Sequence, residues 1–348
     1  MVFTGTGGRL VASEYHRLSQ SRAPRPDRYN ERVITLSDIR AARQRIAGVA
    51  SVTPLLDVSA QAGRPLYLKC ENMQPCGAFK IRGAYNMVAQ LTAEERQRGV
   101  ITYSSGNHGQ AMALAARQLG APAVVVMPKT APRVKVDGAR SFGAEVIFEG
   151  TTSSERRARA ETEAAARGLT IVPPFDHEWI IAGQGTVGLE ILEQCPDAAA
   201  IVVPIGGGGL ASGVVAAVKQ TRPDVRVIGV EPVGAAAMRA SLDAGHPVTL
   251  PSTASVADGL IPVRPGDLTF DYISRLADDV VTVEDAQIVE AVSWTFNRAK
   301  VVAEPSGAAS VAAVLAGLVD AKQRIDGPIV AIISGGNVGV ERLAEWEI

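Results

Sequence analysis

One lysine lies in an apolar segment that glycines punctuate. Lys80 stands between Phe79 and Ile81 in the run from Gly77 to Gly83. Partial burial of such a lysine lowers its pKa, because desolvation disfavours the charged ammonium. The neutral amine that results is what a Schiff-base nucleophile requires. Lys80 is therefore the candidate nucleophile, although a lysine taken at random is usually a solvated surface residue.

A loop of four glycines is the second candidate site. Gly206, Gly207, Gly208 and Gly209 separate an apolar strand pattern from a helical one. Glycine costs conformational entropy on folding. We therefore interpret the run as backbone that lets an anion approach N–H groups at a helix N-terminus, rather than as packing. The loop predicts a phosphate site, and a tight turn without a ligand is the alternative.

The same loop keeps a different cofactor open. Gly206, Gly208 and Ala211 match the dinucleotide fingerprint G-x-G-x-x-G/A, and Glu231 ends the next strand pattern. On these residues alone an NAD-dependent dehydrogenase is a fair interpretation. It leaves Lys80 and the next two turns without an explanation.

Two further turns follow strand patterns. Ser104, Ser105, Asn107 and His108 lie between a strand and a helix, where hydroxyl and backbone donors converge in a cradle suited to a carboxylate. Ser334 begins a Ser-Gly-Gly-Asn turn at the end of another strand. Ligands of open α/β sheets bind at the carboxyl ends of strands. The alternative for the first turn is an ordinary helix cap, and the second turn, taken alone, is equally consistent with a plain turn.

The elements that must position these residues alternate between strand and helix, which predicts an α/β fold. At 348 residues the chain predicts about two domains, and 47% hydrophobic with 5% aromatic residues suits a buried parallel sheet. Ser37 is the expected N-cap of a first helix over 38–47. The strand patterns lie at 99–104, 123–127, 146–148, 169–172, 199–205, 225–230, 280–283 and 329–333.

Composition argues against several classes of protein. Lys and Arg total 35 against 36 Asp and Glu, and no basic stripe marks a nucleic-acid binder. Three cysteines form no disulfide framework, which indicates a reducing compartment, the cytoplasm. No apolar run approaches the ~20 residues that span a bilayer, so no membrane association is expected. Residues 1–30 are expected to be a disordered extension, with an organelle transit peptide as the alternative.

Five segments in the same order carry a family resemblance. They span most of the chain and lie at 77–84, 104–110, 182–186, 206–210 and 334–337. With them the sequence resembles the serine/threonine dehydratase and serine racemase family of fold-type II pyridoxal-phosphate (PLP) enzymes. The resemblance implies a tryptophan synthase β-like fold of two open, twisted, mostly parallel sheets flanked by helices. It implies a large PLP-binding domain over 31–98 and 176–348, a small domain over 99–175, and a homo-oligomer, most often a dimer.

The resemblance also implies roles toward the cofactor. Lys80 would hold PLP as a Schiff base and move the substrate Cα proton. Phe79 would flank the ring, and Asn107 would bond its phenolic oxygen. The backbone from Gly206 to Leu210 would hold the phosphate, and Ser334 would face the pyridine nitrogen.

The substrate implied is a small β-hydroxy amino acid, L-threonine or L-serine, which loses water to give a 2-oxo acid and ammonia. Ser104, Asn107 and His108 would surround its carboxylate. Biosynthetic threonine dehydratases continue into a regulatory domain after their last motif, so feedback inhibition by isoleucine is not expected. The form Pro173-Pro-Phe-Asp176 resembles that of dehydratases.

Two residues keep other members of the family open. Ser105 stands where dehydratases often carry alanine and serine racemases carry a second acid/base, so serine racemase is the alternative. Arg156 aligns with an arginine near the substrate in serine racemases and would favour an acidic substrate such as 3-hydroxyaspartate. A surface arginine on an Ala-rich helix is an equally good interpretation of Arg156.

A divalent cation is a further expectation from the resemblance. Serine racemases bind it with a glutamate like Glu231, a backbone carbonyl and a second carboxylate six residues after the glutamate. Here that last position is Ala237, which leaves Glu231 and the Ala235 carbonyl as candidate ligands. The alternative is a Glu231 that is buried in a salt bridge or lies at the surface.

Overall fold

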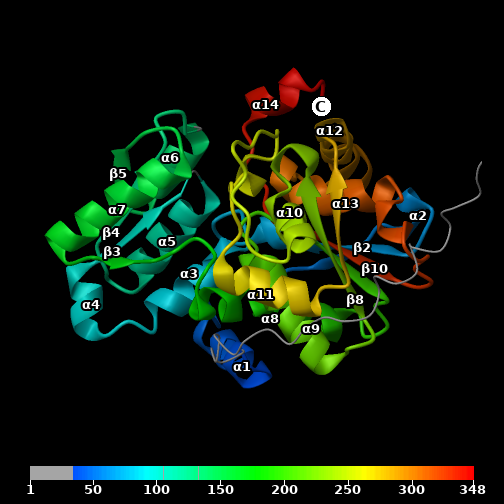
Figure 1. The fold of residues 1–348 in the computed structure, drawn as a ribbon, viewed down its shortest axis with the longest axis horizontal. Helices are drawn as coiled ribbons and strands as arrows, with labels where there is room; N and C mark the ends of the chain where they lie inside the picture. Colours follow the sequence, from blue (N-terminus) through cyan, green and yellow to red (C-terminus); the bar gives the residue numbers. More distant parts are fainter. Residues whose placement is uncertain (1–33, 105, 132) are drawn as a thin grey trace, which may run out of the picture. The chain divides into compact units, whose positions relative to one another are not determined.

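Two β-sheets organise the described part of the chain, which in this computed structural model comprises residues 34–104, 106–131 and 133–348. The six-stranded sheet has the order β1-β2-β10-β7-β8-β9, and the four-stranded sheet has the order β5-β4-β3-β6 (Figure 1). Among the strands of the described residues, only β1 is antiparallel to its neighbour. The predicted fold of two mostly parallel sheets is confirmed. The strands are β1 Leu55–Asp57, β2 Leu66–Cys70, β3 Val100–Tyr103, β4 Ala123–Met127, β5 Glu145–Phe148, β6 Thr170–Ile171, β7 Ala200–Pro204, β8 Arg226–Pro232, β9 Asp279–Val283 and β10 Ile329–Ile333.

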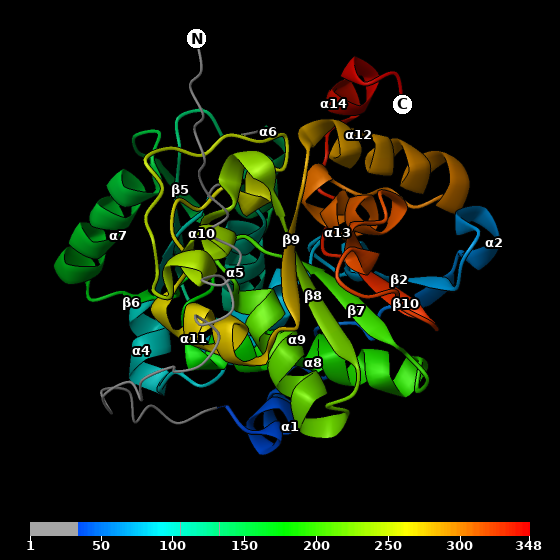
Figure 2. The same ribbon diagram turned by 45° about the vertical axis from the view of Figure 1, so that its right-hand side comes forward.

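Helices cover both faces of each sheet, as the apolar strands require. In the six-stranded sheet, alternate side chains of β7, β8 and β10 pack toward α12 and α13 on one face and toward α8, α9 and α11 on the other (Figure 2). In the four-stranded sheet, α5 and α6 cover one face and α7 the other. The helices are α1 Leu36–Arg45, α2 Ser59–Ala62, α3 Lys80–Val88, α4 Ala93–Arg98, α5 Asn107–Gln118, α6 Arg133–Ser141, α7 Ser153–Arg167, α8 Glu178–Gln194, α9 Gly209–Thr221, α10 Ala237–Ala244, α11 Asp267–Leu276, α12 Asp285–Trp294, α13 Pro305–Leu315 and α14 Val340–Glu345.

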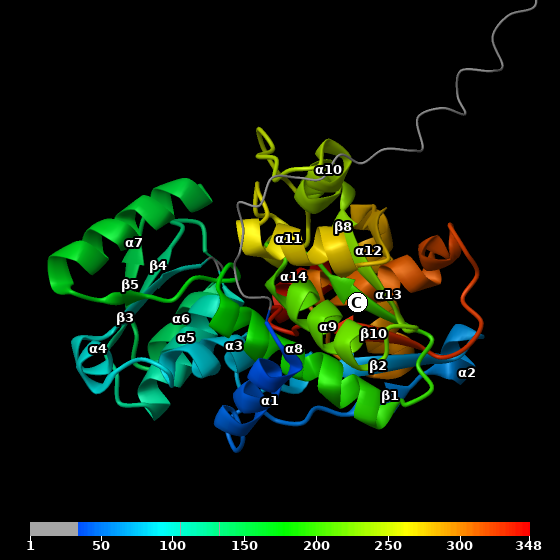
Figure 3. The same cartoon turned by 60° about the horizontal axis from the view of Figure 1, so that its bottom comes forward.

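Helix α3 connects the two sheets. It packs on α8, beneath the six-stranded sheet, and on α5, which covers the four-stranded sheet (Figure 3). Residues 34–348 form one compact unit that contains both sheets, so the two-domain division stays a prediction. The predicted extension over 1–30 and the candidate Ser105 lie outside the described residues. Within the described residues, no helix has both the length and the apolarity to cross a membrane.

The first helix begins earlier than predicted. Its N-cap is Thr35 rather than Ser37. The Thr35 hydroxyl accepts from the Asp38 N–H at 3.2 Å, and the Asp38 carboxylate accepts from the Thr35 N–H at 2.9 Å. This reciprocal capping box needs an acid three residues after the cap, and Ser37 has Arg40 at that position.

Candidate active site

The segment before α3 pairs with the turn after β10. The Phe79 N–H donates to the Ser334 carbonyl at 3.1 Å, and the Gly336 N–H donates to the Gly77 carbonyl at 2.9 Å. Gly77 has a φ of +71°, and a Cβ there would lie 2.2 Å from the Asn337 amide oxygen. Only glycine fits this position. The backbone therefore fixes Lys80 beside Ser334, two residues that lie far apart in the sequence.

The Lys80 amine faces a backbone carbonyl. Its Nζ donates to the Pro174 carbonyl at 2.8 Å and lies 5.0 Å from the centre of the Phe79 ring. Among the described residues, no carboxylate forms an ion pair with it. Burial lowers the pKa of Lys80 to about 8, while the residue stays partly exposed. The amine can therefore lose its proton near neutral pH, as a nucleophile must.

The segment 172–177 links the other candidates to Lys80. The Val172 carbonyl accepts from His108, two residues before the Pro174 carbonyl that accepts from Lys80. The ring of Phe175, the next residue, covers the glycine loop: a Cβ at Gly207 would lie 2.2 Å from that ring. This short segment thus brings His108, Lys80 and the glycine loop together.

The glycine loop joins β7 to the N-terminus of α9. Gly208 has a φ of +97°, which disfavours any other residue. The first N–H groups of α9 have no acceptor within the helix, and its dipole favours an anion there. The sequence argument set packing aside, but here packing also requires glycine: a Cβ at Gly206 would lie 2.8 Å from the Gly259 carbonyl, and one at Gly208 would lie 2.7 Å from Thr269.

Ser334 and Asn107 lie at one edge of this arrangement. The Ser334 hydroxyl is buried and donates to the Ser306 carbonyl over a long 3.4 Å. The Asn107 side chain donates to Glu304 and accepts from Asn337 at 3.0 Å. Its amide is thus oriented by two other side chains, while its expected bond to a cofactor stays a prediction.

Glu304 is a member of the site that the sequence argument missed. It is 2% exposed, and burial raises its pKa to about 7, although Lys135 at 3.7 Å opposes that rise. Lys135 itself donates to Asp258 at 2.6 Å. The sequence signal for Glu304 is the Glu-Pro pair before a small-residue helix, because proline favours the first position of a helix.

His108 is buried in a single tautomer. Its Nε2 lies 3.1 Å from the Val172 carbonyl, which can only accept, so Nε2 carries the proton. Its Nδ1 has no hydrogen-bond partner among the described residues. Burial, together with the charge of Lys80, lowers the pKa of His108 to about 3, against a smaller opposing effect of the Val172 bond. Ser104 lies nearby in sequence, and its hydroxyl accepts from the Gly106 N–H at 3.2 Å.

We expect His108 to remain neutral with its proton on Nε2 from pH 5 to pH 8, because its pKa lies below that range. Histidine-selective ¹⁵N NMR measures this directly, and a His108 signal that titrates near pH 6.5 would contradict it. The unfolded chain binds this proton near the ordinary pKa of about 6.5. The native state therefore loses stability as the pH falls from about 6.5 toward 3, since the unfolded state then holds more protons.

Arg156 is buried within its own helix. It is 7% exposed, so the alternative interpretation as a surface arginine is wrong. Its guanidinium donates to the Thr151 carbonyl and to the Ser153 hydroxyl, each at 3.1 Å, while Nε lacks a partner among the described residues. These bonds hold Arg156 at the N-terminus of α7 and do not connect it with Lys80, so a substrate-binding role stays a prediction.

Glu231 caps a helix. Its two carboxylate oxygens accept from the N–H groups of Met238 and Arg239, at 2.8 and 2.7 Å, at the start of α10. Burial raises its pKa to about 7. Within the described chain, no group of three or more His, Cys, Asp or Glu side chains could hold a metal ion. A cation at Glu231 and Ala235 stays a prediction, and the carboxylate has a structural explanation without one.

A buried ion network anchors α3 two residues after Lys80. Arg82 donates from Nε to Glu71 at 2.7 Å and from Nη1 to Glu190 at 2.6 Å, and Lys69 contacts Glu190 at 2.6 Å. All four side chains are at most 3% exposed. With two charges of each sign, the cluster is neutral, so burial is compensated within it.

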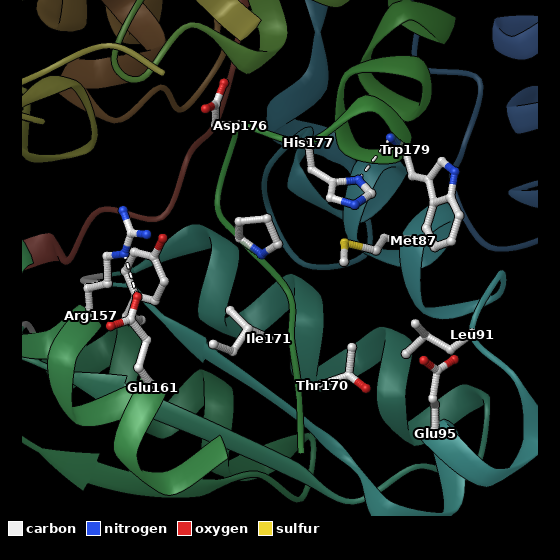
Figure 4. Close-up of a pocket in the computed structure, with 12 residues that line it drawn as sticks. Met87, Leu91, Glu95, Arg157, Glu161, Thr170, Ile171, Asp176, His177 and Trp179 are labelled. Atoms are coloured by element: carbon white, nitrogen blue, oxygen red, sulfur yellow. Dashed lines mark hydrogen bonds and ion pairs between the residues drawn. The ribbon is translucent and has the colours of Figure 1, made fainter. Parts of the chain in front are cut away.

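A cavity of about 450 Å³ lies beside the segment 172–177, on a side that Lys80 does not line. Figure 4 shows Asp176 and His177 from this segment along the cavity, with Arg157 and Glu161 from α7 opposite. None of the residues predicted from the sequence as site residues lines it. Its lining is Met87, Leu91, Glu95, Tyr103, Arg157, Glu161, Thr170, Ile171, Pro173, Asp176, His177 and Trp179.

Known proteins resemble this chain over most of its length. The family model described as "Pyridoxal-phosphate dependent enzyme" matches residues 46–335. An L-threonine ammonia-lyase of Thermotoga maritima is 44% identical over 314 residues, or 89% of this chain and 77% of that protein. A serine racemase of Arabidopsis thaliana is 44% identical over 314 residues, or 89% of this chain and 94% of that protein. The structure of maize serine racemase superposes with a TM-score of 0.86 at 40% identity, covering 90% of this chain and 97% of that one.

Proposed function

The chain belongs to the pyridoxal-phosphate dependent enzyme family, and we propose that it is a threonine/serine ammonia-lyase. It would eliminate water from L-threonine or L-serine and release a 2-oxo acid and ammonia. The observation that carries this proposal is Lys80, a lysine with a pKa near 8 that is held next to Ser334 and bonded to the segment covering the glycine loop.

The residues present fit the cofactor. The glycine loop presents the N-terminus of α9, a 13-residue helix whose dipole suits a phosphate. Lys80 supplies the amine for a covalent bond, and the Ser334 hydroxyl forms only one long hydrogen bond and so can turn toward a ring nitrogen. When bound, PLP supplies an electron sink that stabilises negative charge at the substrate Cα.

Three parts of the chain would then have separate roles in the reaction: Lys80, the glycine loop and Ser334. Once the substrate amine has replaced the Lys80 amine on the cofactor, the freed Lys80 would remove the substrate Cα proton. The N–H groups from Gly206 to Leu210 would hold the phosphate. The hydroxyl of Ser334 does not enforce a proton on the ring nitrogen, as an aspartate would. Charge at Cα is then stabilised less strongly, which favours prompt loss of the β-hydroxyl and hence elimination.

A serine racemase is the second candidate, supported by the Arabidopsis and maize proteins of that name. Ser105 is the residue that would provide the second acid/base for it, since one lysine reaches only one face of the substrate. A 3-hydroxyaspartate dehydratase rests on Arg156 alone. The family match favours PLP over a dinucleotide, and the glycines of the fingerprint at Gly206 would then hold the PLP phosphate.

One substrate panel tests the proposal. We expect the purified protein to be yellow without added nucleotide, and to release ammonia and a 2-oxo acid from L-threonine and L-serine. Chiral chromatography of residual serine measures racemisation in the same samples, and 3-hydroxyaspartate joins the panel as the acidic substrate. A protein that takes up no PLP, or that forms D-serine with no 2-oxo acid, would exclude the lyase.

A further inference from the structure

The Asp176 carboxylate caps the N-terminus of helix α11. Neither Asp176 nor α11 has a role in the function proposed above. Its carboxylate accepts three backbone N–H groups at the start of α11: from Asp267 at 3.0 Å, Leu268 at 3.1 Å and Thr269 at 3.2 Å. A Cβ at Gly266 would lie 2.1 Å from this carboxylate, so the approach requires glycine. Within the described chain, no Lys or Arg forms an ion pair with Asp176. Its partners are backbone dipoles, which favour an anion at this helix end.

The helix held in this way is bonded to the glycine loop. The Thr269 hydroxyl donates to the Gly207 carbonyl at 2.7 Å, and Thr269 is fully buried. The Ser212 hydroxyl, in the first turn of α9, donates to the Thr269 carbonyl at 3.3 Å. Asp176 also directly follows Phe175, whose ring covers Gly207. Two short connections therefore run from Asp176 to the same peptide unit of the loop.

The hydrogen bond from Thr269 to the Gly207 carbonyl also fixes the direction of the next N–H group, that of Gly208. In a trans peptide the carbonyl of one residue and the N–H of the next point in opposite directions. When Thr269 holds the Gly207 carbonyl toward α11, the Gly208 N–H must point away from α11. Glycine backbone would otherwise rotate freely between such orientations. Fixing the carbonyl is therefore a way to fix an N–H donor of the phosphate loop.

We propose that Asp176 is a positioning residue for the cofactor phosphate, acting through α11 and Thr269 on the peptide between Gly207 and Gly208. The inference rests on the proposed function, because it needs a phosphate in the loop. It explains why an acid closes the Pro-Pro-Phe-Asp pattern, for which the reaction itself supplies no role. Asp176 also lines the cavity of Figure 4, which Lys80 and the glycine loop do not line.

The test compares cofactors with and without a phosphate. In Asp176→Asn the side chain keeps one acceptor oxygen but turns an NH₂ group toward backbone donors. We expect the dissociation constant of PLP, measured by absorbance on the cofactor-free protein, to rise about tenfold, the loss of one charge-assisted hydrogen bond. The dissociation constant of pyridoxal, which lacks the phosphate, should change by less than about twofold. Asp271→Asn, on the exposed side of α11 and paired only with Arg275 at 2.8 Å, is the matched control and should change neither.

A second variant keeps the test decisive if Asp176→Asn folds poorly. Thr269→Val removes the shorter of two hydrogen bonds to the Gly207 carbonyl and leaves the longer one, from the Gly266 N–H at 3.4 Å. It should produce the same selective loss of PLP affinity. Parallel losses for PLP and pyridoxal, or unchanged PLP affinity in both variants, would overturn the inference. Failure of the proposed function looks different, because it appears in the wild-type protein: that protein would release no 2-oxo acid from the substrate panel, whether or not it binds PLP.

Discussion

A Lys80→Ala variant is expected to release ammonia from L-threonine and L-serine at least about 10³-fold more slowly than the wild type. Alanine removes both the amine that would bind the cofactor and the base that would move the Cα proton. The folded state should tolerate the change, since the Lys80 amine donates one hydrogen bond, to Pro174, worth about 1 kcal/mol. The rate is measured with an ammonia-coupled assay under saturating substrate and PLP.

Covalent attachment gives an independent measurement of the same role. Borohydride treatment of the wild type should fix one cofactor on the peptide that contains Lys80, and mass spectrometry should find no such mass in the variant. Lys129→Ala, at an exposed lysine, is the matched control and should behave as the wild type does. The assignment of Lys80 is wrong if its alanine variant keeps more than about a tenth of the activity, or still holds the cofactor covalently.

The parts of the fold that could be predicted are those in which local pattern and tertiary structure agree. Strands β4 and β10 were predicted with correct bounds, because both are continuous apolar runs ended by proline or glycine. Strand β2 was not predicted, although it lies inside the six-stranded sheet. It contains Lys69, which interrupts the apolar pattern and whose buried amine is compensated by Glu190 at 2.6 Å, the Thr53 carbonyl and Gln194. A distant ion pair of this kind leaves no local signal.

Some residues of the candidate site could likewise be identified from the sequence, and others could not. Lys80, the glycine loop and Ser334 could be identified because glycines and motif order mark them in the sequence. Pro174 could not, since it acts through its carbonyl, and any residue has one. The Glu-Pro pair marks Glu304 as the start of a helix but not as a site residue, because its bond to Asn107 joins the starts of α13 and α5, which only the fold brings together.

Arg82 carries the largest expected effect on stability. Replacing it with methionine, which keeps most of the volume, removes the partner that contacts both Glu71 and Glu190. Glu190 would then keep its ion pair with Lys69, and Glu71 would keep only the neutral partners Thr53 and Gln74 among the described residues. Breaking a buried ion pair on one side costs about 3–5 kcal/mol. Urea unfolding of the cofactor-free protein measures the loss as a fall in midpoint. Arg43→Met, which breaks the exposed pair with Glu193, should cost no more than about 1 kcal/mol.

The pH dependence of that loss tests its electrostatic origin. Burial acts to raise the pKa of Glu71, but the Arg82 guanidinium, together with Lys69 and the Thr53 hydroxyl, outweighs burial and holds the pKa below the usual value. In the wild type this stability is complete above the unfolded-state pKa and is lost as the pH falls through the lower folded-state pKa. Without Arg82 the desolvated Glu71 carboxylate would take up a proton and become neutral at a higher pH. The gap in stability between wild type and Arg82→Met should therefore narrow as the pH falls below about 4.5. A gap that stays constant down to pH 3 would mean that Arg82 stabilises α3 by packing of its aliphatic part, because packing does not depend on the charge of Glu71 or Glu190.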